Sequence, residues 1–201
     1  MKVTIAVGGL LGSLALVLNI LILGVGSAAA QTVSPGAATA NQQSGANQQG
    51  GGSQVSDQDR TFMMQNAQTD LAEITSGQTA AQRGTNEAIR QTGQTLTNDH
   101  RQALSELQNI AKANSVPLPT TPNAAQRQLA NQLKSSTSAA FDQLYTSSGI
   151  KGHQMSIQGT QQEISSGSNA QVKQFATHYL PVAQKHLQML QQLSSHKTPN
   201  K

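Results

Sequence analysis

Residues 89–110 read IRQTGQTLTNDHRQALSELQNI, and this stretch decides the fold class. Its apolar and small residues recur every three or four positions, and one histidine falls in the same series: Ile89, Gly93, Leu96, His100, Ala103, Leu107 and Ile110. This spacing places side chains on one face of an α-helix. The stretch therefore predicts a long amphipathic helix with a histidine on its buried face.

The same period recurs on both sides of this stretch. Before it, Gly84 ends a helical pattern that begins at Asp57 and carries the stripe Met63, Ala67, Leu71, Ile74, Gln78 and Ala81. After it, prolines interrupt residues 114–122, and three further helices are expected over residues 123–133, 139–164 and 172–193. No stretch alternates apolar and polar residues as a strand does. We expect an all-α fold, an antiparallel four-helix bundle with one longer crossover.

The N-terminus has the pattern of an export signal. Lys2 precedes an apolar run over residues 3–25, and Ala28 to Ala30 supply small residues at a cleavage site. We expect a signal peptide over residues 1–30 that is cleaved before Gln31. The alternative is an uncleaved anchor, in which residues 3–25 span the inner membrane and make the chain's only membrane contact. In both cases the remainder of the chain is exported.

Composition divides the exported part into three segments. Residues 31–56 consist mainly of Gly, Ala, Gln, Asn and Ser with no charged residue, which predicts a disordered linker. Residues 57–195 carry the helical patterns and form the bundle domain. Residues 196–201 are expected to be a flexible tail.

Composition also excludes several classes of function. The net charge is +4, but the basic residues are scattered and aromatic residues make up only 2% of the chain, so we expect no nucleic-acid partner. The absence of cysteine excludes thiolate metal sites and disulfides. No nucleophile elbow, phosphate-binding loop or H-E-x-x-H motif is present, so nothing in the sequence indicates an enzyme.

Three histidines lie on the predicted buried faces of three different helices: His100, His153 and His186. A buried imidazole needs a polar partner, and the sequence offers Asp99 beside His100, and Asp142 and Tyr145 on the helix of His153. One interpretation is that each ring is hydrogen-bonded singly. The other is a mononuclear site for a divalent transition metal, with the three imidazoles and Glu73 of the first helix as ligands. A di-iron site would need Glu three positions before a histidine, and none is present.

The order of short motifs resembles a bacterial exported family catalogued as domain of unknown function 4142. The matching residues are Glu73-Ile74, Asn98-Asp99-His100, Phe141-Asp142-x-x-Tyr145 with His153, and Leu180-Pro181 with His186. The resemblance implies a ferritin-like four-helix bundle in the periplasm or cell envelope, and no established reaction.

Two functions remain open at this stage. The first is a structural or interaction role for the exported bundle, in which the buried polar residues set the register of the helices. The second is a metal-binding or metal-dependent redox protein. Neither the metal nor a protein partner can be named from the sequence.

Overall fold

The computed structural model describes residues 54–195, and that part of the chain is entirely helical. It contains four long helices and one short one: α1 (Asp57–Arg83), α2 (Glu87–Ala113), α3 (Ala124–Ser135), α4 (Ser138–Ser166) and α5 (Ala170–Ser195). The all-α prediction is confirmed. The predicted signal peptide, most of the linker and the tail lie outside the described residues. Among residues 54–195, no helix is sufficiently long and apolar to cross a membrane.

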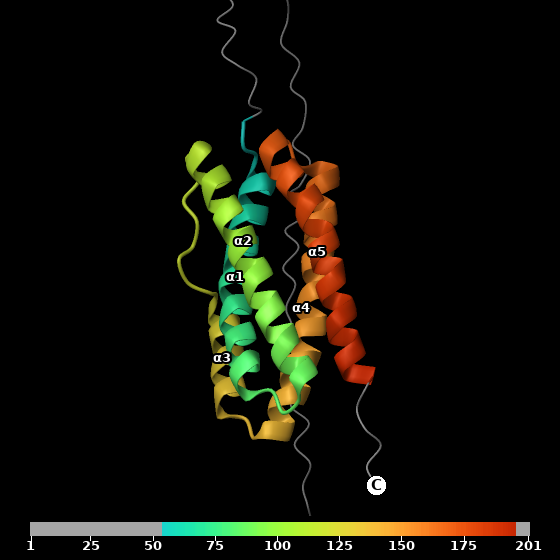
Figure 1. The fold of residues 1–201 in the computed structure, drawn as a ribbon. Coiled ribbons are helices and arrows are strands. Elements are labelled where there is room, and N and C mark those ends of the chain that lie inside the picture. The colour runs from blue at the N-terminus through green and yellow to red at the C-terminus, as the bar shows by residue number, and fades with distance from the viewer. Residues whose placement is uncertain (1–53, 196–201) are drawn as a thin grey trace, which may run out of the picture. The chain divides into compact units, whose positions relative to one another are not determined.

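The long helices pack side by side in two pairs (Figure 1). α1 packs along α2 and α4 packs along α5, while α1 also contacts α4 and α2 contacts α5. The short helix α3 lies mainly against α1. Apolar side chains from all four long helices fill the interior, among them Met63, Leu107, Phe141 and Phe175.

Polar side chains define where the helices begin. Ser56 caps α1: its hydroxyl accepts from the amide of Asp59, whose carboxylate accepts from the amide of Ser56. Asn86 caps α2, and Asn123 caps α3, in the same way through a side-chain oxygen. Since these caps satisfy amides that have no partner within the helix, the local sequence is sufficient to start each helix.

Two glycines allow α1 and α2 to approach closely. A Cβ atom at Gly93 would lie 2.6 Å from the backbone oxygen of Gly77, and one at Gly77 would lie 2.7 Å from the backbone oxygen of Gly93. Backbone atoms cannot move aside as the end of a flexible side chain can. The absence of a side chain at both positions therefore sets the separation of the two helices.

We expect the substitution Gly93→Ala to lower the free energy of unfolding by about 1–3 kcal/mol, because the added methyl group forces the two helices apart. Urea denaturation would measure this loss. The matched control is Gly159→Ala, since a Cβ atom there meets nothing within 4 Å. That control should raise the stability by ~0.5–1 kcal/mol through helix propensity alone. Equal effects of the two substitutions would contradict the packing argument.

The buried face of α1 differs from the predicted stripe. Gln78 is exposed, and Leu71 and Ile74 are only partly buried. The face that enters the interior instead runs through Asn66, Asp70 and Gly77, as well as through Met63 and Ala67. The predicted stripe holds at Met63 and Ala67 but is wrong at Leu71, Ile74 and Gln78, because the close contact with α2 and the polar interior select small and polar residues that hydrophobicity does not mark.

A pair of buried acids joins the ends of three helices. Asp59 of α1 accepts hydrogen bonds from the amides of Ser168 and Asn169 at the start of α5, at 3.0 and 3.1 Å. Glu163 of α4 is fully buried, and Gln58 of α1 donates to its Oε2 at 3.3 Å. Burial and the neighbouring Asp59 raise the pKa of Glu163 to about 7. Burial also acts to raise the pKa of Asp59, but hydrogen bonds from Ser56, Ser168 and Glu163 outweigh it and hold that pKa well below its usual range.

This pair predicts a loss of stability as the pH rises from about 4.5 toward neutrality. Between pH 4.5 and about 7 the folded state keeps a proton on Glu163 that the unfolded state has lost, so unfolding becomes easier as the pH increases across that window. The variant Glu163→Gln keeps a donor for Asp59 without a titratable group. We expect its thermal midpoint to exceed that of the wild type by about 5 °C at pH 8, and to match it at pH 5. A difference that does not change between these pH values would contradict the assignment of the proton to Glu163.

Candidate metal centre

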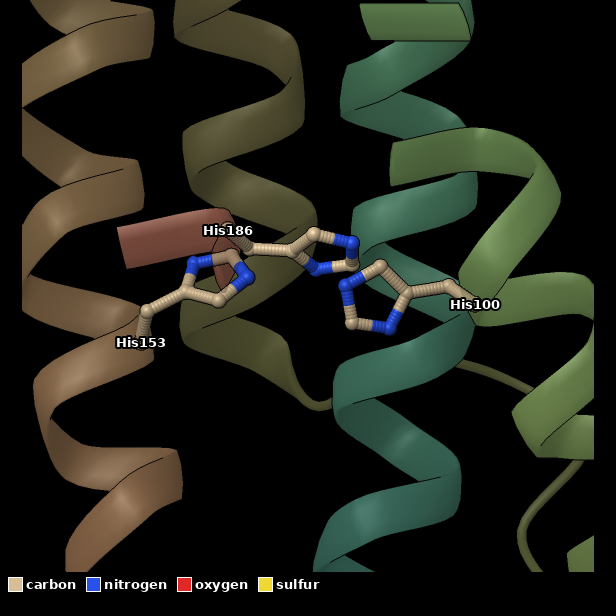
Figure 2. Close-up of side chains that lie close together, drawn as sticks. All are labelled: His100, His153 and His186. Atoms are coloured by element: carbon tan, nitrogen blue, oxygen red, sulfur yellow. The ribbon is translucent and has the colours of Figure 1, made fainter. Parts of the chain in front are cut away.

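Three imidazole rings from three helices converge in the interior (Figure 2). His100 of α2, His153 of α4 and His186 of α5 each offer one ring nitrogen, and these atoms all lie within 4.8 Å of one another. The ring centroids are 5.2–5.7 Å apart. The exposed fractions of the three residues are 1%, 2% and 0%. The structure therefore brings together the three histidines that the sequence placed on buried faces.

The outer nitrogen of each ring is held by a hydrogen bond. His100 Nδ1 lies 2.8 Å from Asp70 Oδ1, and His186 Nε2 lies 2.9 Å from Asp99 Oδ2. His153 Nδ1 lies 2.9 Å from the backbone oxygen of Gly149. A carbonyl oxygen can only accept, so His153 donates from Nδ1 and its Nε2 carries a free lone pair. These contacts fix the orientation of all three rings.

The other nitrogen of each ring is buried without a hydrogen-bond partner: His100 Nε2, His153 Nε2 and His186 Nδ1. A buried polar atom without a partner costs about 1–3 kcal/mol. Three such atoms in one place form a site for a single electron-pair acceptor such as a metal ion. With a carboxylate or carbonyl behind each ring, the arrangement is the one that orients metal-binding histidines.

Burial keeps the rings of His100 and His186 neutral. It lowers the pKa of His100 to about 4, against the opposing effect of the Glu73 charge. It also lowers the pKa of His186 to about 4, against the hydrogen bond to Asp99, and the neighbouring histidines act in the same direction as burial. Since the neutral ring is the form that binds metal, these two rings are in the binding form well below neutral pH.

Asp70 is the fourth helix's contribution to the centre. It is fully buried on α1, and burial together with the charge of Glu73 raises the pKa of its carboxyl well above the usual range. Asn66 donates a hydrogen bond to its second oxygen at 3.4 Å. Asp70 therefore holds His100 from α1, and each of the four long helices supplies a group to the centre.

The structure separates the other residues that the sequence singled out. Asp99 pairs with His186 on α5 and not with its neighbour in sequence, His100. Asp142 accepts from the amide and the hydroxyl of Thr85 in the turn between α1 and α2, away from the histidines. Tyr145 is buried and stacked on Phe141, with its hydroxyl unpartnered. Glu73 is half-buried on α1 and outside the cluster of three nitrogens.

Sequence reasoning missed two groups that hold the rings. Asp70 was not among the candidate partners of the histidines, and the carbonyl of Gly149 has no side-chain signature. A sequence signal for Asp70 does exist, because it follows Met63 and Ala67 by seven and three positions and so shares their face. The carbonyl of Gly149 could have been found from its position one helical turn before His153.

Comparison with known proteins agrees with this architecture. The sequence profile of a family described as "Domain of unknown function (DUF4142)" matches residues 44–193, so the chain belongs to that family. No curated protein matches it. Among solved structures, the crystal structure of a DUF305 fragment from Deinococcus radiodurans is similar, with a TM-score of 0.63 and 11% sequence identity. The match covers 71% of this chain and 99% of that chain, and at this identity it shows a shared fold only.

Proposed function

We propose that this chain is an exported, ferritin-like four-helix bundle whose interior binds one transition-metal ion through His100, His153 and His186. One observation carries the proposal: three buried ring nitrogens without partners come from three helices to one place. A folded protein keeps such costly groups together where a ligand satisfies them.

The distances are compatible with a single ion. Bonds of about 2.0–2.1 Å to a tetrahedral ion put two nitrogens about 3.4 Å apart. The nitrogens lie within 4.8 Å of one another, so small rotations of the side chains bring them to bonding distance. Three protein ligands leave one position of the ion for water or another small ligand.

The ligand set selects the class of metal. Imidazole suits copper, zinc, nickel and iron, whereas magnesium and calcium prefer oxygen ligands. Among divalent first-row ions, copper binds such sites most tightly. Because imidazole is a neutral ligand, the Asp99 carboxylate behind His186 supplies the negative charge that offsets the ion, while Asp70 orients His100.

The alternative is a structural or interaction role in which each histidine is satisfied by its own hydrogen bond. The outer nitrogens fit that role, but the three inner nitrogens do not. The metal-binding function is therefore favoured over the structural one, and export through the N-terminal segment would place the site in the periplasm or cell envelope.

Metal content and coordination test the proposal. The chain is treated with a chelator, equilibrated with Cu²⁺ or Zn²⁺ and dialysed, and its metal content is measured by elemental analysis. We expect one ion per chain, and we expect the electron paramagnetic resonance spectrum of the Cu²⁺ form to show nitrogen couplings. Replacement of any one of the three histidines by leucine should weaken retention at least tenfold.

The control is His178→Leu, since His178 is exposed on α5 and is no part of the cluster. It should retain metal as the wild type does. A wild-type chain that holds no ion after dialysis, or a His153→Leu variant that holds as much as the wild type, would show that the three histidines are not a metal site.

A further inference from the structure

We propose that metal ions reach the three-histidine centre through the groove between α1, α3 and α4, and that the Glu73 carboxylate on the groove wall captures the ion first. This inference rests on the proposed function, because it assigns a route and a transfer residue to that same site.

The groove is a hollow of about 620 Å³. α1 contributes Asn66, Glu73 and Ser76, α3 contributes Gln126 and Leu129, and α4 contributes Gly152, Ser156 and Gly159. The lining carries amide and hydroxyl groups, one carboxylate, that of Glu73, and one amine, that of Lys151. The oxygen atoms of these groups can replace part of the water shell of an entering cation.

Two hydrogen-bonded contacts lead from the groove wall to the centre. Asn66 lines the groove and donates to Asp70, which holds His100. Ser156 lines the groove and donates to the hydroxyl of Tyr179 at 3.4 Å. The ring of Tyr179 packs on His100 with centroids 6.3 Å apart. Two side chains of the groove wall therefore contact the residues that hold His100 or pack on it.

Glu73 is the acidic residue of the groove lining, and its Oε1 lies beside Gly152, the residue before His153. Its charge also acts on the pKa values of His100, Asp70 and both tyrosines. Its only hydrogen bond from another side chain within residues 54–195 is a long one of 3.4 Å from Ser76. Among those residues no basic group lies within ion-pair distance of it. An unpaired carboxylate at this position can hold a cation briefly and release it.

Gly152 keeps the space beside Glu73 open. A Cβ atom at this position would lie 3.6 Å from Glu73 Oε1, and His153 is the next residue along α4. A branched side chain at position 152 would therefore fill the groove beside the Glu73 carboxylate.

The opposite side of the centre is less suited to entry. A smaller hollow of about 320 Å³ lies between α2 and α5, and its lining includes Asp99, Glu106 and Tyr179. The Asp99 carboxylate there is already engaged by His186 and, at 4.0 Å, by Lys185. The hydrogen bond to Asp99 occupies Nε2 of His186, so this ring offers no free nitrogen to an ion that arrives from this side.

The rate of metal loading tests the route. The chain has two tyrosines and no tryptophan, and Tyr179 packs on His100, so quenching of tyrosine fluorescence by Cu²⁺ reports arrival at the centre. We expect Glu73→Gln to slow loading in stopped-flow mixing roughly tenfold, because an attractive charge raises the rate of encounter. The final occupancy should remain one ion per chain. Increasing salt should slow loading of the wild type more than that of the variant.

Two further variants complete the experiment. Gly152→Val, which fills the groove, should also slow loading, with helical content checked by circular dichroism. Glu106→Gln removes the same charge from the opposite hollow and should load as the wild type does. A Glu73→Gln chain that loads at the wild-type rate to full occupancy would overturn the route and leave the metal site intact, as would slowing by Glu106→Gln alone. A wild-type chain that takes up no ion would instead overturn the metal site itself.

Discussion

Saturating metal is expected to raise the free energy of unfolding of the wild-type chain by about 4 kcal/mol when the free ion exceeds its Kd ~1,000-fold. The gain arises because the ion binds only the folded state, in which helices α2, α4 and α5 bring His100, His153 and His186 together. Chemical denaturation at fixed free metal measures this gain, with Cu²⁺, Zn²⁺, Ni²⁺ and Fe²⁺ compared in turn. Magnesium, which prefers oxygen ligands, is the matched negative control.

The variant His153→Leu should abolish this gain while preserving the metal-free fold. Its Nδ1 bonds only to the carbonyl of Gly149, and its Nε2 has no partner, so leucine removes a buried polar atom without leaving another side chain unpaired. We expect the metal-free variant to be as stable as the wild type, or more stable by about 1 kcal/mol. A variant that is still stabilised by metal to the wild-type extent would exclude His153 as a ligand.

Acid is expected to destabilise the metal-free protein through the buried histidines. Burial lowers the pKa of His186 from 6.5 to about 4, so between these pH values the unfolded state binds a proton that the folded state does not. Stability therefore falls as the pH decreases through this window. At 1.4 kcal/mol per pKa unit, the full contribution of His186 is about 3 kcal/mol.

This measurement belongs in the Glu163→Gln background, since protonation of Glu163 stabilises the folded state over part of the same window. The free energy of unfolding is compared between pH 7 and pH 4.5 with and without His186→Leu. The leucine variant leaves Asp99 with a side chain that is 32% exposed, so that water can satisfy its carboxylate. We expect the leucine variant to lose less stability on acidification. An unchanged acid sensitivity would show that His186 does not carry the effect.

The positions of the helices could be predicted from the sequence because they depend on interactions between residues that are close together in the chain. The stripe from Ile89 to Ile110 appears as α2, and the prolines after Ser115 end it where expected. The buried faces of α2 and α5 could also be predicted, because apolar residues surround His100 and His186 on those faces. For α1 the same reasoning failed, because Gly77 and Asp70 occupy its buried face for reasons of close approach and hydrogen bonding.

Sequence by itself determined which helices form and that three histidines point inward, since both depend on the period of one helix and its caps. Only the tertiary structure decided that the three rings meet at one level, because a helical stripe gives a direction but no height along the axis. It also decided the partners. Asp99 pairs with His186 across the interface of α2 and α5, and Asp70 reaches His100 from α1. Such contacts depend on how far two helices slide past each other, and that is set by the packing of the whole interior, including the close approach at Gly77 and Gly93.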